Sequence, residues 1–213
     1  MRISKKQRTL TIIELLEQAY PVAQCSLEYD EAWKLLVSVR LAAQCTDERV
    51  NIVVKDLYQQ YPTLSDLADA TVEEIEKIVR PCGLGKSKAK DIHACMNVLM
   101  KQYHGEVPCD FESLLALPGV GRKSANLIMG DVFGKPAIVT DTHCIRLVNR
   151  LGLVNQIKDP KKVEMELWKL IPKEKGNDFC HRLVYHGRAV CTARTTPKCE
   201  TCCLNQVCKK VGV

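Results

Sequence analysis

Five cysteines lie close together in the C-terminal tail, and closely spaced thiolates bind metals. They are Cys191, Cys199, Cys202, Cys203 and Cys208. Four of them form a C-x7-C-x2-C-x5-C pattern when Cys202 is counted in place of Cys203. Four thiolates in one short segment can hold a structural zinc ion or an iron–sulfur cluster. The tail has one close pair where structural zinc usually uses two, which argues against zinc without excluding it. A tail of free thiols is the third alternative.

A second candidate site is the segment Leu117–Ala125, which reads LPGVGRKSA. The apolar pattern on either side predicts a helix that ends before this segment and another that begins near Gly121. Gly119 and Gly121 permit a tight turn, because glycine adopts positive φ and lets another backbone approach. The N–H groups of such a turn and of the next helix attract anions, and Arg122 and Lys123 add positive charge. The segment indicates a phosphate site; a plain turn with a solvated basic end is the alternative.

The elements that must position these residues are helical. Apolar residues recur at i, i+3 and i+4 spacing in residues 31–43, 47–61, 88–103 and 121–132. Sustained period-2 alternation, which is typical of strands, is absent. Capping signals mark helix starts at Thr71, Asp110 and Asp159, and Asn177 or Asp178 can cap a helix over 178–190. We predict an all-α fold of roughly ten short helices that gives way to a cysteine loop after about residue 190.

The composition narrows the class of protein. The chain has 213 residues, 46% of them hydrophobic and 26% charged, which is ordinary for a soluble globular protein of one or two domains. A net charge of +6 allows a polyanionic partner without requiring one. We expect no membrane span and no signal peptide, and hence a cytoplasmic or nucleoid protein.

Of twelve cysteines, seven are expected to be buried thiols, namely Cys25, Cys45, Cys82, Cys95, Cys109, Cys144 and Cys180.

Residues 117–125 resemble the helix-hairpin-helix motif of DNA repair proteins. The later segment Val139-Thr140-Asp141-Thr142-His143 resembles the (V/T)-D-T-H segment of the endonuclease III family. In that family the hairpin lysine is the nucleophile and the aspartate assists it. The resemblance implies that Lys123 and Asp141 are the catalytic pair of a DNA glycosylase with AP lyase activity. Taken alone, Asp141 reads as a helix N-cap. His143 is a minor candidate for a phosphate contact and could instead simply pack.

The chemistry that the resemblance implies suits these residue types. A neutral lysine amine can attack C1′ of a deoxyribose, displace the damaged base and form an imine. The imine makes the C2′ proton acidic, and its removal expels the 3′ phosphate by β-elimination. An unperturbed lysine has a pKa of about 10.4, so a nucleophilic lysine benefits from a helix N-terminus, a neighbouring arginine and desolvation. A nearby aspartate fits a proton acceptor or a stabiliser of positive charge at C1′, and the sequence leaves both open.

The cysteine tail is similar to the [4Fe–4S] loop of the same family. Its first gap is one residue longer than the six usual there. Counting Cys202 preserves the two later gaps, so Cys203 is expected to be a bystander. Arg194 and Lys198 lie between the first two ligands and could contact DNA phosphates or be solvated. The resemblance implies four cluster ligands: Cys191, Cys199, Cys202 and Cys208.

Two further segments resemble DNA-facing loops of the family. Residues 41–47 match its L-x-x-Q-x-T-D helix end, and Gly83-Leu84-Gly85 with the lysines after it matches a second loop. In the family, the glutamine and the leucine enter the duplex where the damaged nucleotide has left it. Base flipping needs such fillers because an open stack costs a few kcal/mol. The resemblance assigns these roles to Gln44 and Leu84; a helix-end polar residue and a half-buried loop leucine are the alternatives.

The resemblance covers residues from about 25 to 210. It implies a six-helix domain (about 25–135), with the helix-hairpin-helix motif at about 112–133. It also implies a helical cluster domain formed by 1–24 and 136–213, with DNA in the cleft between the two. The expected partner of this monomer is double-stranded DNA that carries oxidised pyrimidines or abasic sites.

Two other functions compete with this one. A related adenine glycosylase carries a catalytic glutamate four residues before the glutamine, where this chain has Arg40, and it lacks the hairpin lysine. A non-catalytic DNA-binding module would use the hairpin alone. Lys123 and Asp141 at the family spacing argue against that module.

Overall fold

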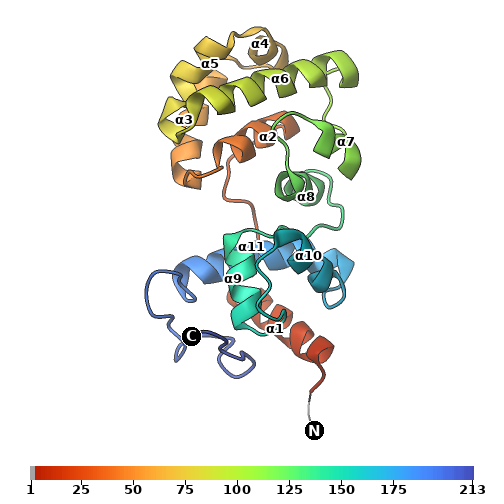
Figure 1. Ribbon diagram of the computed structural model, residues 1–213, viewed down its shortest axis with the longest axis vertical. Coiled ribbons are helices and arrows are strands. Elements are labelled where there is room, and N and C mark those ends of the chain that lie inside the picture. The colour runs from red at the N-terminus through yellow and green to blue at the C-terminus, as the bar shows by residue number, and fades with distance from the viewer. Residues whose placement is uncertain (1–2) are drawn as a thin grey trace. The chain divides into compact units, whose positions relative to one another are not determined.

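A computed structural model describes residues 3–213, which form eleven α-helices, two short 3-10 helices and no strand (Figure 1). The prediction of an all-α fold is confirmed. Within this described range, we find no helix with the length and apolar character that crossing a membrane requires. The chain divides into two compact units. One is Cys25–Phe133, and the other combines the residues up to Gln24 with Gly134–Val213.

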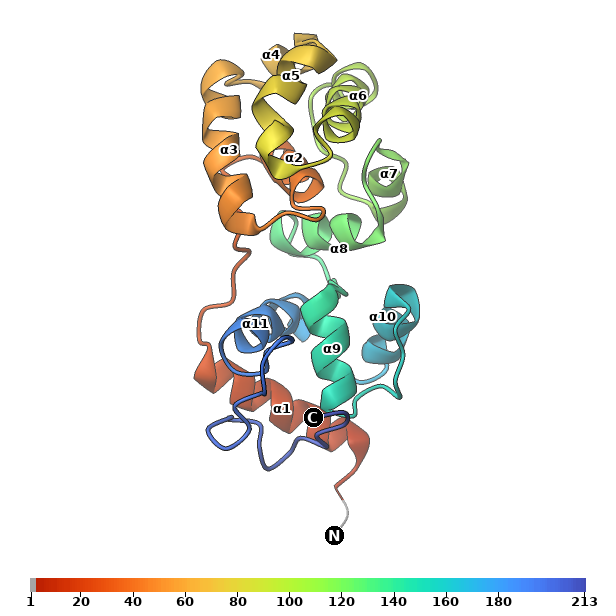
Figure 2. The same cartoon turned by 60° about the vertical axis from the view of Figure 1, so that its left-hand side comes forward.

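The unit Cys25–Phe133 is built around one long helix. Its elements are α2 (Ala32–Leu41), α3 (Asp47–Gln60), α4 (Leu64–Asp69), α5 (Val72–Val79), the 3-10 turn η1 (Arg80–Cys82), α6 (Gly85–Tyr103), α7 (Phe111–Ala116) and α8 (Arg122–Asp131). The long helix α6 packs against α2, α4 and α5, and α8 packs against α2 and α7 (Figures 1 and 2). Ile92 and Leu99 of α6 are fully buried, as is Ile128 of α8. This core anchors both ends of the turn before α8.

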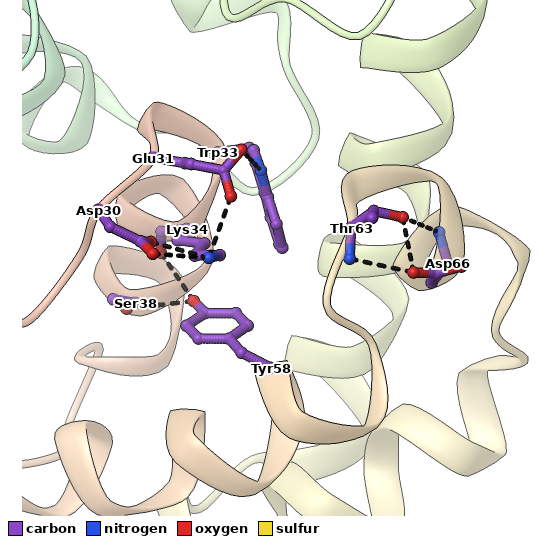
Figure 3. Close-up of polar contacts among 8 residues, drawn as sticks. All are labelled: Asp30, Glu31, Trp33, Lys34, Ser38, Tyr58, Thr63 and Asp66. Atoms are coloured by element: carbon purple, nitrogen blue, oxygen red, sulfur yellow. Dashed lines mark hydrogen bonds and ion pairs between the residues drawn. The ribbon is translucent and has the colours of Figure 1, made fainter.

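This unit has seven α-helices where six were expected, and the additional one is the short α4. Its capping box is complete: Asp66 N donates to Thr63 Oγ1 at 3.1 Å, and Thr63 N donates to Asp66 Oδ2 at 3.0 Å (Figure 3). The helix is six residues long, so too few apolar positions repeat to reveal it. The T-x-x-D pattern was the signal that could have located it. The same signal correctly placed the start of α5 at Thr71.

A polar cluster fixes the beginning of α2 on α3. Lys34 Nζ lies 2.8 Å from Asp30 Oδ1 and 3.0 Å from Glu31 Oε1. Tyr58 of α3 donates its hydroxyl to Lys34 O at 2.9 Å, and its ring meets Trp33 edge-on at 5.5 Å between centroids (Figure 3). An edge-to-face aromatic pair with a hydrogen-bonded hydroxyl stabilises the packing of α2 on α3. Helix α2, whose C-terminal end leads to Gln44, is anchored on α3 by these contacts.

The second unit contains α1 (Lys5–Ala19), α9 (Thr142–Arg150), α10 (Pro160–Trp168), the 3-10 turn η2 (Lys173–Lys175) and α11 (Gly176–Ala189). Helix α11 packs against α1 and α9 (Figure 2). Asp159 caps α10 with Pro160 at its first position, as predicted. The prediction of a cap at Asn177 or Asp178 is wrong. Helix α11 begins at Gly176 directly after η2 and has no side-chain cap.

The cysteines outside the tail are not all buried. Cys82, Cys95, Cys144 and Cys180 are buried as expected. The expectation is wrong for Cys25 and Cys45, which are partly exposed, and for Cys109, which is exposed. Cys109 lies in the loop before α7, just ahead of the capping residue of that helix. Apolar periodicity does not extend into such loops, so it does not report burial there.

Candidate active site and metal-binding loop

The glycine turn between α7 and α8 needs only its first glycine for conformation. Gly119 has a φ of 76°, and a Cβ built there would lie 2.8 Å from Asp91 Cβ. Both facts exclude larger residues at this position. Gly121 instead has extended backbone, with φ −96° and ψ 175°, and it is the N-cap of α8. A Cβ on Gly121 would meet nothing within 4 Å. That open space leaves the N-terminus of α8 accessible to a ligand.

The glycine turn packs against an ion pair between α2 and α6. Arg40 Nε donates to Asp91 Oδ2 at 2.7 Å, and Arg40 Nη2 lies 2.6 Å from the same oxygen. A Cβ on Gly119 would also come within 3.1 Å of Arg40. The backbone at Gly119 is therefore in close contact with the Arg40–Asp91 pair. This pair joins the end of α2 to α6. The position where an adenine glycosylase carries its glutamate holds a structural ion pair in this chain.

Lys123 is exposed in the first turn of α8, immediately after the glycine turn. Its neighbour Arg122 is half-buried and stacks over Phe111, with the guanidinium carbon 4.8 Å from the ring centroid. The positive charge of Lys123 acts to lower the pKa of the nearby Cys25 thiol. Burial nevertheless raises the pKa of Cys25 to about 12. This thiol therefore stays protonated at neutral pH and is a poor nucleophile.

Asp141 belongs to the other unit, where it is the N-cap of α9. Its Oδ1 accepts a hydrogen bond from Cys144 N at 2.6 Å. The preceding residues 137–140 are buried and hold the start of α9 in place. The cap interpretation is therefore correct as far as local structure goes. Capping uses one of the two carboxylate oxygens, so it does not conflict with a catalytic role.

His143 lies in the first turn of α9 and packs against α11. Arg146 Nη2 lies 3.2 Å from His143 Nδ1, and a Cβ on Gly187 would come within 2.6 Å of that nitrogen. The imidazole is half-buried at this close approach. These contacts support the packing role that the sequence left open, and the DNA contact stays a prediction.

Gln44 and Leu84 share an uncommon backbone conformation. Gln44 has a φ of 57° and Leu84 a φ of 51°, both in the left-handed region. Gln44 lies between the end of α2 and the Thr46 cap of α3, and Leu84 is the N-cap of α6. Non-glycine residues in this region are strained and concentrate at functional sites. Leu84 is 56% exposed, so the alternative of a half-buried leucine is wrong.

The four cysteines of the tail pattern line a single cavity. Its wall is completed by apolar side chains such as Leu147, Leu151 and Leu204, and it encloses about 410 Å³ of empty space, part of it open to solvent. Cys203, by contrast, is exposed. Among residues 3–213, no three His, Cys, Asp or Glu side chains converge closely enough to hold one ion. The lining cysteines are Cys191, Cys199, Cys202 and Cys208.

Hydrogen-bond donors point at the sulfur atoms of this cavity. Arg150 Nη1 donates to Cys191 Sγ at 3.3 Å. Leu204 N and Lys210 N donate to Cys202 Sγ and Cys208 Sγ, each at 3.3 Å. Such donors stabilise thiolates and tune the clusters that they bind. Four thiols, an apolar wall and donors to sulfur together fit a [4Fe–4S] cluster.

The cysteine loop is also tied to α1. Arg8 Nη1 donates to Leu151 O at 2.6 Å and to Val207 O at 3.0 Å, and Nη2 donates to Gly152 O at 2.9 Å. The N-terminal helix, the turn after α9 and the loop therefore meet at one guanidinium. Sequence analysis did not identify Arg8, because its partners lie far away in the sequence.

Residues 37–173 match the HhH-GPD superfamily of base excision DNA repair proteins. The endonuclease III of Synechocystis sp. is 46% identical over 96% of this chain and 93% of its own length. The endonuclease III of Escherichia coli is 37% identical over 96% of each chain. This chain belongs to the endonuclease III family. It is a base excision repair enzyme, a DNA glycosylase with AP lyase activity.

Solved structures agree with this assignment. A non-covalent endonuclease III–DNA complex matches with a TM-score of 0.91 and 38% identity, covering 98% of this chain and 97% of that one. A trapped covalent intermediate of endonuclease III with DNA matches with the same values. A thermostable thymine-DNA glycosylase, 22% identical with a TM-score of 0.86, shares the fold.

The two units of this endonuclease III family member divide the predicted residues between them. The unit Cys25–Phe133 carries Gln44, Leu84 and the glycine turn with Lys123. The other unit carries Asp141 and the cysteine loop. Arg194 and Lys198 are both exposed on that loop, which is compatible with phosphate contact and with solvation alike.

Proposed function

We propose that Lys123 is the nucleophile with which this enzyme excises oxidised pyrimidines and then cleaves the abasic site. The observation that carries the proposal is an exposed lysine in the first turn of α8, next to a glycine turn that leaves the helix N-terminus open. A helix N-terminus attracts DNA phosphate, which would bring the damaged strand beside this amine. The likeness to a trapped covalent intermediate supports a route through a covalent adduct.

In this route, neutral Lys123 Nζ attacks C1′ of the damaged nucleotide, and the C1′–N bond to the base breaks. Loss of a proton from nitrogen and opening of the sugar ring give an imine. Removal of the C2′ proton then breaks the bond to the 3′ phosphate and nicks the strand. Asp141 assists as the proton acceptor or as the stabiliser of positive charge at C1′. Both roles require its negative charge.

We assign a [4Fe–4S] cluster to Cys191, Cys199, Cys202 and Cys208. When bound, the cluster cross-links the loop that these residues span and thereby orders it. On the ordered loop, Arg194 and Lys198 contact DNA phosphates. The exposure of both side chains supports this role.

At the hairpin, Gly119, Gly121 and Arg122 hold a phosphate of the same duplex, and His143 makes a minor contact. Backbone N–H groups and an arginine suit this task because they fix the register of the duplex without reading its sequence. The enzyme acts as a monomer on damaged double-stranded DNA, in the cytoplasm at the nucleoid.

A panel of duplexes tests the substrate assignment. It contains 5-hydroxycytosine, an abasic site, adenine opposite 8-oxoguanine, and an undamaged control. We expect release of the oxidised pyrimidine together with strand cleavage, and cleavage of the abasic duplex. Adenine should stay in place, because Arg40 is engaged with Asp91 where a catalytic glutamate would be needed. Adenine release without a nick would replace this proposal with the adenine glycosylase function.

The proposed fillers give a second test. A side chain that fills an opened stack contributes only when a nucleotide is extruded. Gln44→Ala and Leu84→Ala should each weaken binding to a duplex with an abasic-site analogue by roughly 1–3 kcal/mol. Binding to undamaged duplex should change little, and its steep salt dependence should remain, because phosphate contacts dominate there. The measurement is binding to both duplexes across a salt series.

Matched controls exist in the same unit. Gln59 and Ile52 are exposed on α3, so Gln59→Ala removes a second glutamine and Ile52→Ala removes an apolar side chain of the same size as leucine. Both should retain the preference for the abasic analogue. Equal losses on the two duplexes in the Gln44 and Leu84 variants would show ordinary surface contacts, and the filler roles would be withdrawn.

A further inference from the structure

Lys88 of α6 is a fully buried lysine. Its side chain is 0% exposed. Burying an ammonium group is costly unless hydrogen bonds replace its water. Lys88 Nζ donates to Leu41 O and to Cys82 O, each at 2.8 Å. Its neighbours in the sequence, Lys86 and Lys90, are exposed, so the burial of Lys88 is specific.

The two acceptors of Lys88 are the ends of two helical segments. Leu41 is the last residue of α2, and Cys82 is the last residue of η1. Terminal carbonyls lack partners within their own helix, and they carry the negative end of its dipole. One buried ammonium therefore satisfies both ends and joins them. The chain continues from Leu41 at the end of α2 to Gln44, and from Cys82 at the end of η1 to Leu84.

A second contact shows that these segments lie against each other. Burial, followed by the electrostatic influence of the neighbouring Cys45 thiol, raises the pKa of Cys82 to about 11. Cys45 follows Gln44, and Cys82 precedes Leu84 by two residues. The buried charge of Lys88 faces the dipoles of the two carbonyls to which it donates. Burial accordingly lowers the pKa of Lys88.

The strained backbone at Gln44 and Leu84 explains why a contact such as that of Lys88 is needed. Gln44 and Leu84 both occupy the left-handed region, which persists only where surrounding contacts impose it. Side chains already held in their bound conformation lose less conformational freedom on binding. We infer that Lys88 is a positioning residue that holds Gln44 and Leu84 together in the conformation in which they enter the duplex. This inference rests on the filler roles proposed above.

The test compares Lys88→Met with Lys90→Met. Methionine has a similar length but no donor, so Lys88→Met releases both carbonyls, whereas Lys90→Met removes an exposed charge from the same helix. We measure binding of the intact enzyme to an abasic-analogue duplex and to undamaged duplex. Lys88→Met should lower the ratio of the two affinities by about tenfold, as expected when a stacking interaction is removed. Lys90→Met should leave this ratio unchanged.

A merely structural role would not give this pattern, because partial unfolding reduces both affinities equally. Thermal melting of each variant reports the folded fraction. In a Gln44→Ala/Leu84→Ala background, Lys88→Met should cause no further loss of the ratio, since it acts through those residues. Lys88→Gln, which keeps one donor group, serves if Lys88→Met does not fold. If neither variant folds, Lys88 is a folding residue and the inference is overturned.

The outcomes separate the two proposals. If Gln44→Ala and Leu84→Ala keep the full preference for the abasic analogue, the filler roles themselves are wrong. If those variants lose the preference while folded Lys88→Met keeps it, the filler roles stand and the inference about Lys88 is overturned.

Discussion

Lys123→Gln should abolish trapping of a covalent enzyme–DNA adduct by borohydride. Borohydride reduces an imine, and an imine requires a primary amine, which glutamine lacks. Loss of the nucleophile should lower single-turnover cleavage of an abasic duplex by at least roughly a thousandfold. Lys123 is exposed on α8, so the fold should survive its replacement. The readouts are adduct on a denaturing gel and the rate of strand cleavage.

Arg122→Gln is the matched control, since it removes a positive charge from the adjacent position and keeps the amine. It should weaken DNA binding yet still give full trapping at saturating enzyme. Undiminished trapping in Lys123→Gln would mean that another amine forms the imine, and the assignment of Lys123 would fall.

Asp141→Asn separates catalysis from capping in the other unit. Asparagine is as good an N-cap as aspartate, so α9 and its melting temperature should be preserved. Without the carboxylate charge, the single-turnover rate should fall by roughly 10²–10⁴-fold, the usual range for an acid–base group. A wild-type rate in the folded variant would leave Asp141 with its capping role alone.

Cys202→Ser should lose the metal centre, and Cys203→Ser should retain it. Cys202 lines the cavity with the other three cysteines and accepts a hydrogen bond from Leu204 N, whereas Cys203 is exposed. The purified protein should be yellow-brown, with about four irons and four sulfides per chain. Both variants make the same substitution at adjacent positions, so each serves as the control for the other. Iron and sulfide analysis with visible absorption is the measurement.

Loss of the metal centre should also weaken DNA binding, because the loop that carries Arg194 and Lys198 would no longer be held. The salt dependence of binding should become shallower, because the enzyme would then neutralise fewer DNA phosphates. One zinc per chain in colourless protein would contradict the cluster. Loss of iron in Cys203→Ser with retention in Cys202→Ser would mean that the other neighbour is the ligand.

The local signals in the sequence were sufficient for most of the architecture. Helix starts at Thr71, Asp110 and Asp159 follow from capping, because a cap and the N–H that it satisfies lie within one turn. The turn at Gly119 follows from the tolerance of glycine for positive φ. The same reasoning failed where the signal was short, as at α4. It also failed at Asn177 and Asp178, because α11 continues directly from η2 and needs no side-chain cap there.

Only the tertiary structure decided which charged residues are structural. The sequence does not reveal that Arg40 and Asp91, on two different helices, form an ion pair that the turn at Gly119 contacts. Lys88 reads as one of several lysines in a basic segment, yet it is buried. Its acceptor Leu41 O lies 47 residues away in the sequence. Burial and hydrogen bonding at that separation depend on how α2 and α6 pack, and no local pattern of residue types encodes the packing of two particular helices.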